Sequence, residues 1–128
     1  MNKTLFSLEY PLKSASINIL WNLISTPMGL SEWFADGITV KDDREFTFLW
    51  EKNEETAFLI ESKQNVSVRF QWEEDANTDY FFEIRIIVFE VTGDLSLLIT
   101  DFAEPDEKAD AIFLWNHLIE ILCRKAGM

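Results

Sequence analysis

The chain has 128 residues, a formal net charge of −12 and one cysteine, Cys123. This length suits a single domain, residues 1–128, with one continuous core. The lone cysteine excludes an intrachain disulfide and a cysteine-rich metal site. The negative charge excludes nucleic acids as favoured partners, because their phosphates would be repelled.

No targeting or membrane segment is expected. Residues 1–10 lack the long apolar core of a signal peptide, and no apolar run approaches the roughly 18 residues that span a bilayer. We therefore expect a cytoplasmic protein without membrane insertion. Aromatic residues make up 14% of the chain, and such a stock of large side chains suits a filled core, a pocket lining or a partner surface.

The first predicted elements are a strand and an amphipathic helix. Residues 4–10 alternate between apolar and polar side chains, and Pro11 is expected to end this strand. The apolar face of the strand comprises Phe6, Leu8 and Tyr10. Ser14 is the predicted N-cap of the helix that follows. The apolar stripe of that helix comprises Ile17, Leu20, Trp21 and Ile24.

A short helix with two aromatic residues is predicted next. Thr26 is placed to cap it, and Pro27 at its first position has no N–H to leave unsatisfied. Leu30, Trp33 and Phe34 then recur at helical spacing, so their side chains leave one side of this helix.

After a turn at residues 36–37, the apolar pattern changes to a period of two as far as residue 102, which predicts an antiparallel meander with one apolar face. The pattern favours a three-residue loop at 63–65 with Asn65 left-handed, since this register pairs Phe58 with Phe70. The turn near residue 93 leaves two alternatives open. A two-residue turn points Asp101 inward, and a three-residue turn points it outward.

Charged residues of the meander are expected on its solvated face or in its turns. Four of them have outward parity, and we expect cross-strand ion pairs among them. They are Glu61, Arg69, Glu83 and Arg85. Acidic clusters at residues 54–55, 73–75 and 104–107 fall on predicted turns or a helix start, where solvation explains them without a calcium-binding pattern.

The last predicted element is a helix from residue 105 to residue 126. Asp106 and Glu107 suit its positive N-terminus, and Arg124 and Lys125 suit its C-terminus, with Gly127 just beyond. Apolar residues cover about half of its circumference at 100° per residue. So broad a stripe favours a helix cradled in a curved sheet.

The order of these elements and the segment that carries Thr26, Pro27, Leu30, Trp33 and Phe34 resemble the START-like or Bet v 1-like helix-grip superfamily. Within it, the chain is most similar to the group that shares the C-terminal domain of the heat-shock ATPase activator. The resemblance implies an α+β helix-grip fold. In this fold a curved antiparallel meander sheet wraps around a long C-terminal helix, and two short helices follow the first strand.

The resemblance also implies a cavity between the sheet and the last helix, which other members use for lipids, sterols, polyketides or hormones. Together with strand parity, it predicts the lining residues Trp33, Phe48, Phe58, Phe70, Tyr80, Phe82, Asp101, Trp115 and Leu118. Tyr80 or Asp101 would orient the polar end of a ligand. The chain departs from the family at residues 42–45, where relatives often have a Gly-Gly turn.

Two candidate contact surfaces lie outside this cavity. His117, the single histidine, falls with Phe113 and Arg124 on the helix face away from the apolar stripe, which indicates a protein contact. An apolar strip on the outer face of the meander predicts a homodimer through the sheet. This strip comprises Phe81, Ile87 and Phe89.

The leading functional hypothesis is a non-enzymatic protein that binds an apolar or lipid-like small molecule. A protein-interaction or cochaperone-like module with a filled core is the alternative, and a cyclase-type or hydrolase-type enzyme comes third. The enzyme ranks last because no inward acid–base pair is evident and His117 is expected on the surface. We expect no catalytic residues, no metal and no cofactor.

Overall fold

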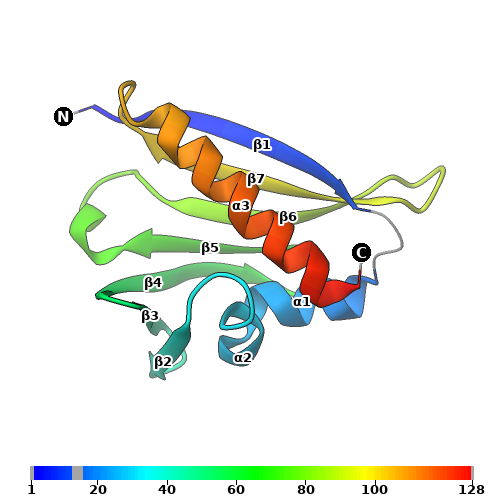
Figure 1. The fold of residues 1–128 in the computed structure, drawn as a ribbon, viewed down its shortest axis with the longest axis horizontal. Helices are drawn as coiled ribbons and strands as arrows, with labels where there is room; N and C mark the ends of the chain where they lie inside the picture. The colour runs from blue at the N-terminus through cyan, green and yellow to red at the C-terminus, as the bar shows by residue number, and fades with distance from the viewer. Residues whose placement is uncertain (1, 13–15, 128) are drawn as a thin grey trace.

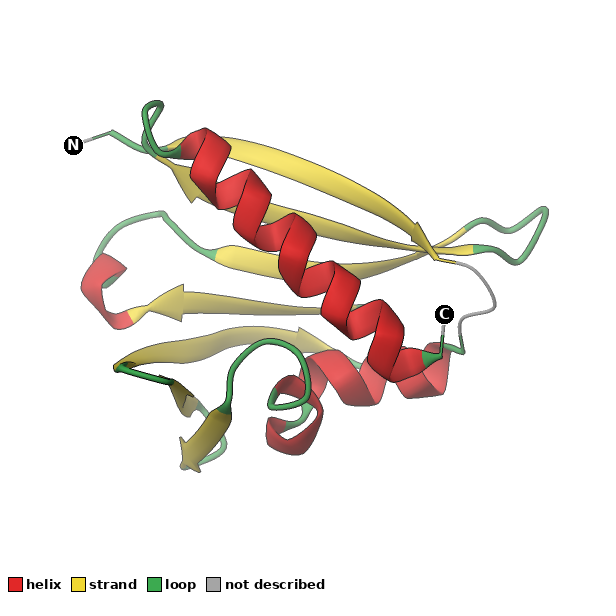
Figure 2. Ribbon diagram, viewed as in Figure 1, coloured by secondary structure: helices red, strands yellow, loops and turns green. Residues whose placement is uncertain are grey.

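The structure, a computed structural model, describes residues 2–12 and 16–127. A long helix lies diagonally across one antiparallel sheet, and two short helices lie near its C-terminal end (Figures 1 and 2). The strands are β1 (Thr4–Leu12), β2 (Gly37–Lys41), β3 (Glu45–Trp50), β4 (Asn53–Lys63), β5 (Ser67–Trp72), β6 (Phe82–Val88) and β7 (Leu95–Ala103). The helices are α1 (Ile17–Ser25), α2 (Pro27–Leu30), the 3₁₀ helix η1 (Glu73–Asp75) and α3 (Lys108–Ala126).

The sheet has the strand order β1-β7-β6-β5-β4-β3-β2, and its neighbouring strands are antiparallel. All strands except β1 lie beside their neighbours in sequence, as a meander requires. Helix α3 buries Trp115, Ile119 and Leu122, and Gly127 ends it in the left-handed conformation with a φ of 76°. The predicted α+β helix-grip architecture is confirmed, including the two short helices after the first strand.

The first strand and helix differ from prediction at their boundaries. Strand β1 continues through Pro11 to Leu12 instead of ending at the proline. Because β1 is an edge strand that pairs only with β7, the sheet tolerates a residue without an N–H there. Ser14, the predicted cap, lies outside the described residues, and Ser16 holds the N-cap position of α1.

The Thr26 cap and the start of α2 at Pro27 are as predicted, but the helix is shorter than predicted: it ends at Leu30, and Trp33 and Phe34 lie in the loop that follows. The Thr26 hydroxyl accepts a hydrogen bond from the N–H of Gly29 (2.9 Å) and caps α2. The indole Nε1 of Trp33 donates to the carbonyl oxygen of Leu23 at 2.8 Å. This bond ties the loop that follows α2 back to α1, and the Trp33 side chain is buried.

The hairpin of β2 and β3 uses the residues at which the chain departs from the family pattern. Asp42 and Asp43 have positive φ angles of 55° and 56° in the loop of residues 42–44, and the N–H of Arg44 donates to the carbonyl oxygen of Lys41 at 3.2 Å. Aspartate adopts this conformation more readily than most residues because its short polar side chain can bond locally. The alternation of apolar and polar residues did not predict β2 as a separate strand of the meander.

The loop between β4 and β5 has the predicted length but is displaced by one position. Lys63 pairs with Ser67, so the loop comprises residues 64–66. Asn65 has the expected left-handed conformation, with a φ of 63°. Asparagine is among the few non-glycine residues that adopt it routinely.

A β-bulge in β4 then changes which residues face inward. The register with β5 shifts between Leu59 and Glu61. Phe58 therefore pairs with Gln71 rather than with Phe70, and it lies on the outer face of the sheet. The predicted pairing was wrong because one extra residue in a strand reverses the side-chain parity beyond it.

The connection between β6 and β7 decides the direction of Asp101. Val88 pairs with Leu95, and the N–H of Phe89 donates to the carbonyl oxygen of Asp94 (2.9 Å). The loop is longer than either predicted turn. Its parity nevertheless places Asp101 on the inner face, where it contacts α3.

Three of the four outward charged residues form ion pairs on the outer face. Arg69 Nη2 lies 2.8 Å from Glu83 Oε1, and Arg85 Nε lies 3.1 Å from Glu83 Oε2. Burial alone would raise the pKa of Glu83, but the hydrogen bonds and charges of Arg85 and Arg69 outweigh it and hold the pKa below its usual value. Cross-strand pairing is confirmed for Arg69 and Glu83, whereas Arg85 pairs with Glu83 within β6. Glu61 has no ion-pair partner in the described ranges.

Glu83→Gln is expected to lower the free energy of unfolding at neutral pH by about 1–3 kcal/mol, because both guanidinium groups lose a charged acceptor. A carboxyl group whose pKa is lowered by folding stabilises the protein above its unfolded pKa, and this contribution is lost as pH falls through the folded pKa. The gap between variant and wild type should therefore close as the pH falls through the lowered pKa of Glu83. Urea unfolding across a pH series measures it, with Glu61→Gln as the control. A gap that persists unchanged at acidic pH would contradict the ion-pair assignment.

Candidate functional site

A cavity of about 330 Å³ lies between the sheet and α3. Its walls come from segments that are far apart in sequence, namely the loop after α2, four strands of the sheet and the middle of α3. The lining residues are Phe34, Trp50, Asn53, Glu55, Trp72, Asp101, Leu114, Trp115 and Leu118. This space can hold a small organic molecule.

Aromatic side chains form much of the cavity wall. The Phe34 ring centroid lies 5.9 Å from that of Trp115 and 6.0 Å from that of Trp50. The Trp50 ring lies 6.3 Å from the Trp72 ring. Trp50 Nε1 donates to the carbonyl oxygen of Phe34 (2.9 Å), which holds the loop after α2 against β3. Trp50 and Trp72 are only half-buried, so part of each indole is available to a ligand.

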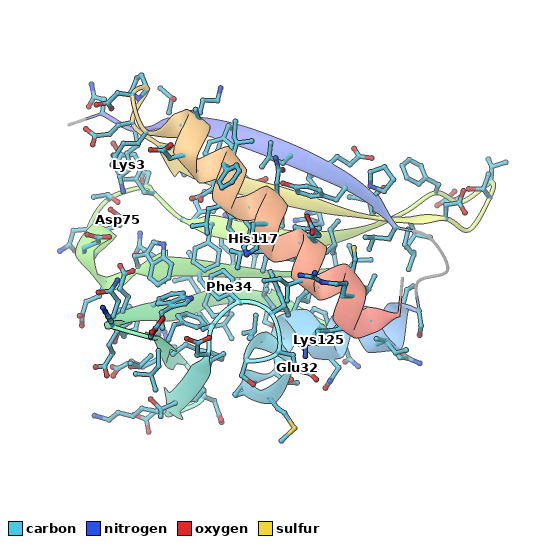
Figure 3. All side chains as sticks on the ribbon, in the orientation of Figure 1. Lys3, Glu32, Phe34, Asp75, His117 and Lys125 are labelled. Atoms are coloured by element: carbon cyan, nitrogen blue, oxygen red, sulfur yellow. The ribbon has the colours of Figure 1, made fainter. Side chains whose placement is uncertain are left out.

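Asp101 is a half-buried carboxyl group at the wall formed by β7. Its Oδ2 accepts a hydrogen bond from Trp115 Nε1 (2.9 Å), and its Oδ1 accepts one from the N–H of Phe102 (2.7 Å). Burial raises the pKa of Asp101, and the two hydrogen bonds and the charge of Lys3 oppose this only in part. Lys3 is itself paired with Asp75 at 3.1 Å (Figure 3).

Glu55 brings a second carboxyl group to the same cavity. It belongs to β4 and not to the predicted solvated turn, and it pairs in register with Phe48, whose side chain is fully buried. Partial burial raises the pKa of Glu55, and the negative charge of Glu74 adds to this shift. Two carboxyl groups therefore line one cavity, which the sequence analysis did not foresee.

The predicted lining residues fall into groups with different surroundings. Asp101, Trp115 and Leu118 line the cavity. Trp33, Phe48, Phe70 and Phe82 are buried in the core. Phe58 faces outward because of the bulge in β4. Tyr80 lies away from the cavity, and its hydroxyl accepts a hydrogen bond from the N–H of Lys3 (3.0 Å).

Several lining residues were absent from the predicted set. They are Phe34, Trp50, Asn53, Glu55, Trp72 and Leu114. Trp50 and Trp72 share the strand parity of Phe48 and Phe70, so the alternation did contain their signal. Asn53 and Glu55 follow a tight turn at residues 51–52, where no periodicity indicates direction.

The predicted contact residues of α3 are on the surface. Phe113 is 76% exposed, and His117 and Arg124 are exposed as well. His117 also lines a hollow of about 350 Å³ between α3 and the loop after α2. This hollow shares Phe34, Trp50, Leu114 and Leu118 with the cavity.

The predicted outer strip is partly covered by its own neighbours. The Arg69 guanidinium lies 4.0 Å from the centroid of the Phe81 ring, and the ring of Phe102 lies 5.2 Å from the same centroid. Ile87 is half-buried. Phe89, 45% exposed, lies in the β6–β7 loop and lines a separate hollow of about 640 Å³.

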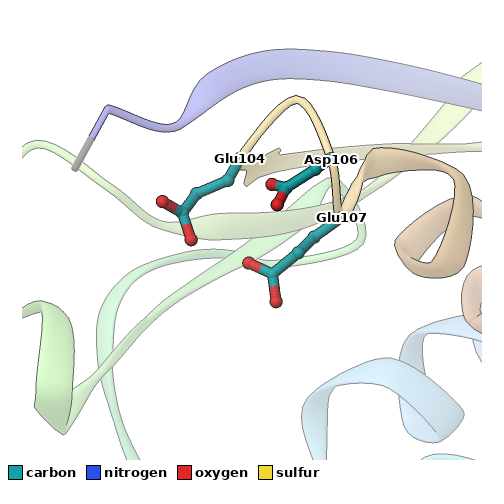
Figure 4. Close-up of side chains that lie close together, drawn as sticks. All are labelled: Glu104, Asp106 and Glu107. Carbon is teal, nitrogen blue, oxygen red and sulfur yellow. The ribbon is translucent and has the colours of Figure 1, made fainter.

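Three carboxyl groups gather in the loop before α3 (Figure 4). One oxygen each of Glu104, Asp106 and Glu107 lie within 4.8 Å of one another. A hydrogen bond with Glu104 raises the pKa of Glu107. Solvation accounts for a cluster in which two of the three residues are exposed, and we assign no metal to it.

The whole chain, residues 1–128, matches the family model of the START-like superfamily domain. The chain belongs to the START-like superfamily. It is 40% identical to BfR322 from Bacteroides fragilis, whose solution structure matches with a TM-score of 0.69 over 98% of this chain and 92% of that one. A comparison with curated proteins finds no match.

More distant solved structures share the fold. The Aha1 dimer from Colwellia psychrerythraea is 14% identical, with a TM-score of 0.78 over 96% of both chains. DynU16, from the dynemicin biosynthetic locus, is 10% identical, with a TM-score of 0.74 over 94% of this START-like chain and 46% of DynU16. The predicted likeness to the heat-shock ATPase activator group is confirmed at the level of fold. Among the described helices, none is long and apolar enough to cross a membrane.

Proposed function

We propose that this START-like chain binds a small apolar or amphipathic molecule between the sheet and α3. The cavity itself carries the proposal. Its volume of about 330 Å³ lies within the range of roughly 300–1,000 Å³ that is usual for ligand sites. Aromatic and aliphatic walls with a few polar groups are the usual composition of such sites. An open cavity also favours this function over an interaction module with a filled core.

Leu118→Trp is expected to fill part of the cavity and weaken ligand binding by about tenfold or more. Leu118 is half-buried and lines the cavity from α3. Phe113→Trp is the matched control, because it adds an indole to the exposed side of the same helix. Circular dichroism should show both variants folded.

Native mass spectrometry of gently purified protein, followed by denaturing analysis of released molecules, measures the occupancy. We expect one reproducible small molecule to accompany the wild type and Phe113→Trp, and to be lost from Leu118→Trp. Equal occupancy of all three proteins would show that the ligand lies elsewhere. Wild-type protein without any ligand would count against the proposal.

The outer face of the sheet supports a further part of the proposal, a cytoplasmic homodimer. Leu5 is 56% exposed and pairs in register with Phe102, whose ring packs against Phe81. An exposed apolar face of this kind suits a second copy of the chain, and the Colwellia relative is described as a dimer. The same mass measurement tests the homodimer, since a species of only 15.0 kDa would exclude it.

A different protein remains the proposed partner of the exposed α3 surface that carries Phe113, His117 and Arg124.

A further inference from the structure

The lining of the cavity contains acidic residues and no basic ones. Its polar lining residues are Asn53, Glu55 and Asp101, and the lining includes neither lysine nor arginine. In the part of the chain that the structure describes, Glu55 has no ion-pair partner. The Lys3 ammonium acts on Asp101 through its charge but is paired with Asp75 at 3.1 Å.

The negative charge extends beyond the cavity. An adjoining hollow of about 270 Å³ shares Glu55 and Trp72 with it. The residues that line this hollow are Glu54, Glu55, Thr56, Trp72, Glu73 and Glu74. The net charge of −12 acts in the same direction. A ligand with a carboxylate or phosphate group would be repelled at this end of the cavity.

The aromatic walls supply an attraction that complements this charge. A cation is attracted to the face of a tryptophan or phenylalanine ring within about 6 Å of its centroid. The Trp50 and Trp72 rings, which both line the cavity, have centroids 6.3 Å apart and planes inclined by 51°. Trp115 approaches from α3, held by its hydrogen bond to Asp101. Rings on several sides of one space are the arrangement that recognises alkylammonium groups.

We infer that the cavity binds an organic ammonium ion with an apolar body, its positive charge lying against the indole rings in the negative potential of Glu55 from β4 and Asp101 from β7. This inference rests on the proposed function, because it names the ligand class of the same cavity. The cation would supply a positive charge inside the cavity, whose lining contains none. The apolar body would lie against Leu114 and Leu118, the aliphatic residues of the lining.

Three probes that share a para-hydroxybenzyl group test the charge of the ligand. They are para-hydroxybenzyl-trimethylammonium, its uncharged isostere para-neopentylphenol, and the anion para-hydroxyphenylacetate. Titrations followed by the NMR signals of the tryptophan Nε1–H groups give the dissociation constants. We expect the cation to bind about tenfold more tightly than its isostere, and the anion to bind most weakly.

Variants then test the carboxyl groups. Glu55→Gln and Asp101→Asn should each weaken binding of the cation by about fivefold and leave the isostere unaffected. The Glu55 side chain is exposed, so its replacement should not disturb folding. In Asp101→Asn, the asparagine side chain keeps an acceptor for Trp115 Nε1. Glu120→Gln, an exposed change on α3 with the same loss of charge, is the control and should affect neither probe.

The outcomes separate the two proposals. The inference is supported if the cation binds more tightly than its isostere, if Glu55→Gln and Asp101→Asn weaken its binding, and if Glu120→Gln does not. An isostere that binds as tightly as the cation overturns the inference and leaves the proposed function standing. Failure of all three probes to bind at millimolar concentration overturns both.

Discussion

Phe82→Ala is expected to lower the free energy of unfolding by about 3–5 kcal/mol. The Phe82 side chain is 1% exposed and lies at the centre of the aromatic core. Its ring centroid is 5.3 Å from that of Phe70 and 5.2 Å from that of Trp72, and it also contacts Phe34 and Trp115 at 5.6 Å and 6.0 Å. Truncation removes these contacts and leaves a void that a close-packed interior closes only in part.

The control for this prediction is Phe113→Ala, which removes the same atoms from a side chain that is 76% exposed. Its effect on the free energy of unfolding should stay within about 0.5 kcal/mol. Urea unfolding of the two variants and the wild type, compared at equal m-value, gives both numbers. Equal losses in the two variants would contradict the assignment of Phe82 to the core and Phe113 to the surface.

The fold was predictable because its signals are local. The Thr26 cap and the proline after it define the start of α2 without reference to any other part of the chain. The alternation of residues in the meander and the broad stripe of α3 each follow from a short periodicity. Together these patterns left few architectures open, and a sheet crossed by one long helix satisfies all of them.

The cavity was less predictable because its walls depend on register and on loop geometry. The bulge in β4 turned Phe58 outward, and the alternation of apolar and polar residues gives no sign of the extra residue that makes a bulge. The direction of Asp101 depended on a loop whose length the sequence left open. Glu55 lines the cavity because the turn before it has only two residues. The sequence analysis placed it in a solvated turn because its neighbour in sequence, Glu54, is also acidic.

Gly29→Ala is expected to destabilise the protein by about 3 kcal/mol or more, although alanine normally stabilises a helix relative to glycine. A Cβ atom at position 29 would lie 2.0 Å from the carbonyl oxygen of Asn22 and 2.7 Å from Leu23 Cα. Both contacts are with the backbone of α1, so no side chain can move aside. Helix α2 would have to shift away from α1.

Gly37→Ala is the matched control, because its Cβ would lie 3.5 Å from Leu49 Cδ1, an ordinary van der Waals contact. Thermal unfolding should show a large loss for Gly29→Ala and almost none for Gly37→Ala, and similar melting temperatures would contradict the close approach of α1 and α2. The same shift would strain the bond from Trp33 Nε1 to the carbonyl oxygen of Leu23. The next residue, Phe34, lines the cavity. Ligand binding by folded Gly29→Ala should therefore be weaker than binding by the wild type, because the packing of the two short helices positions this wall of the cavity.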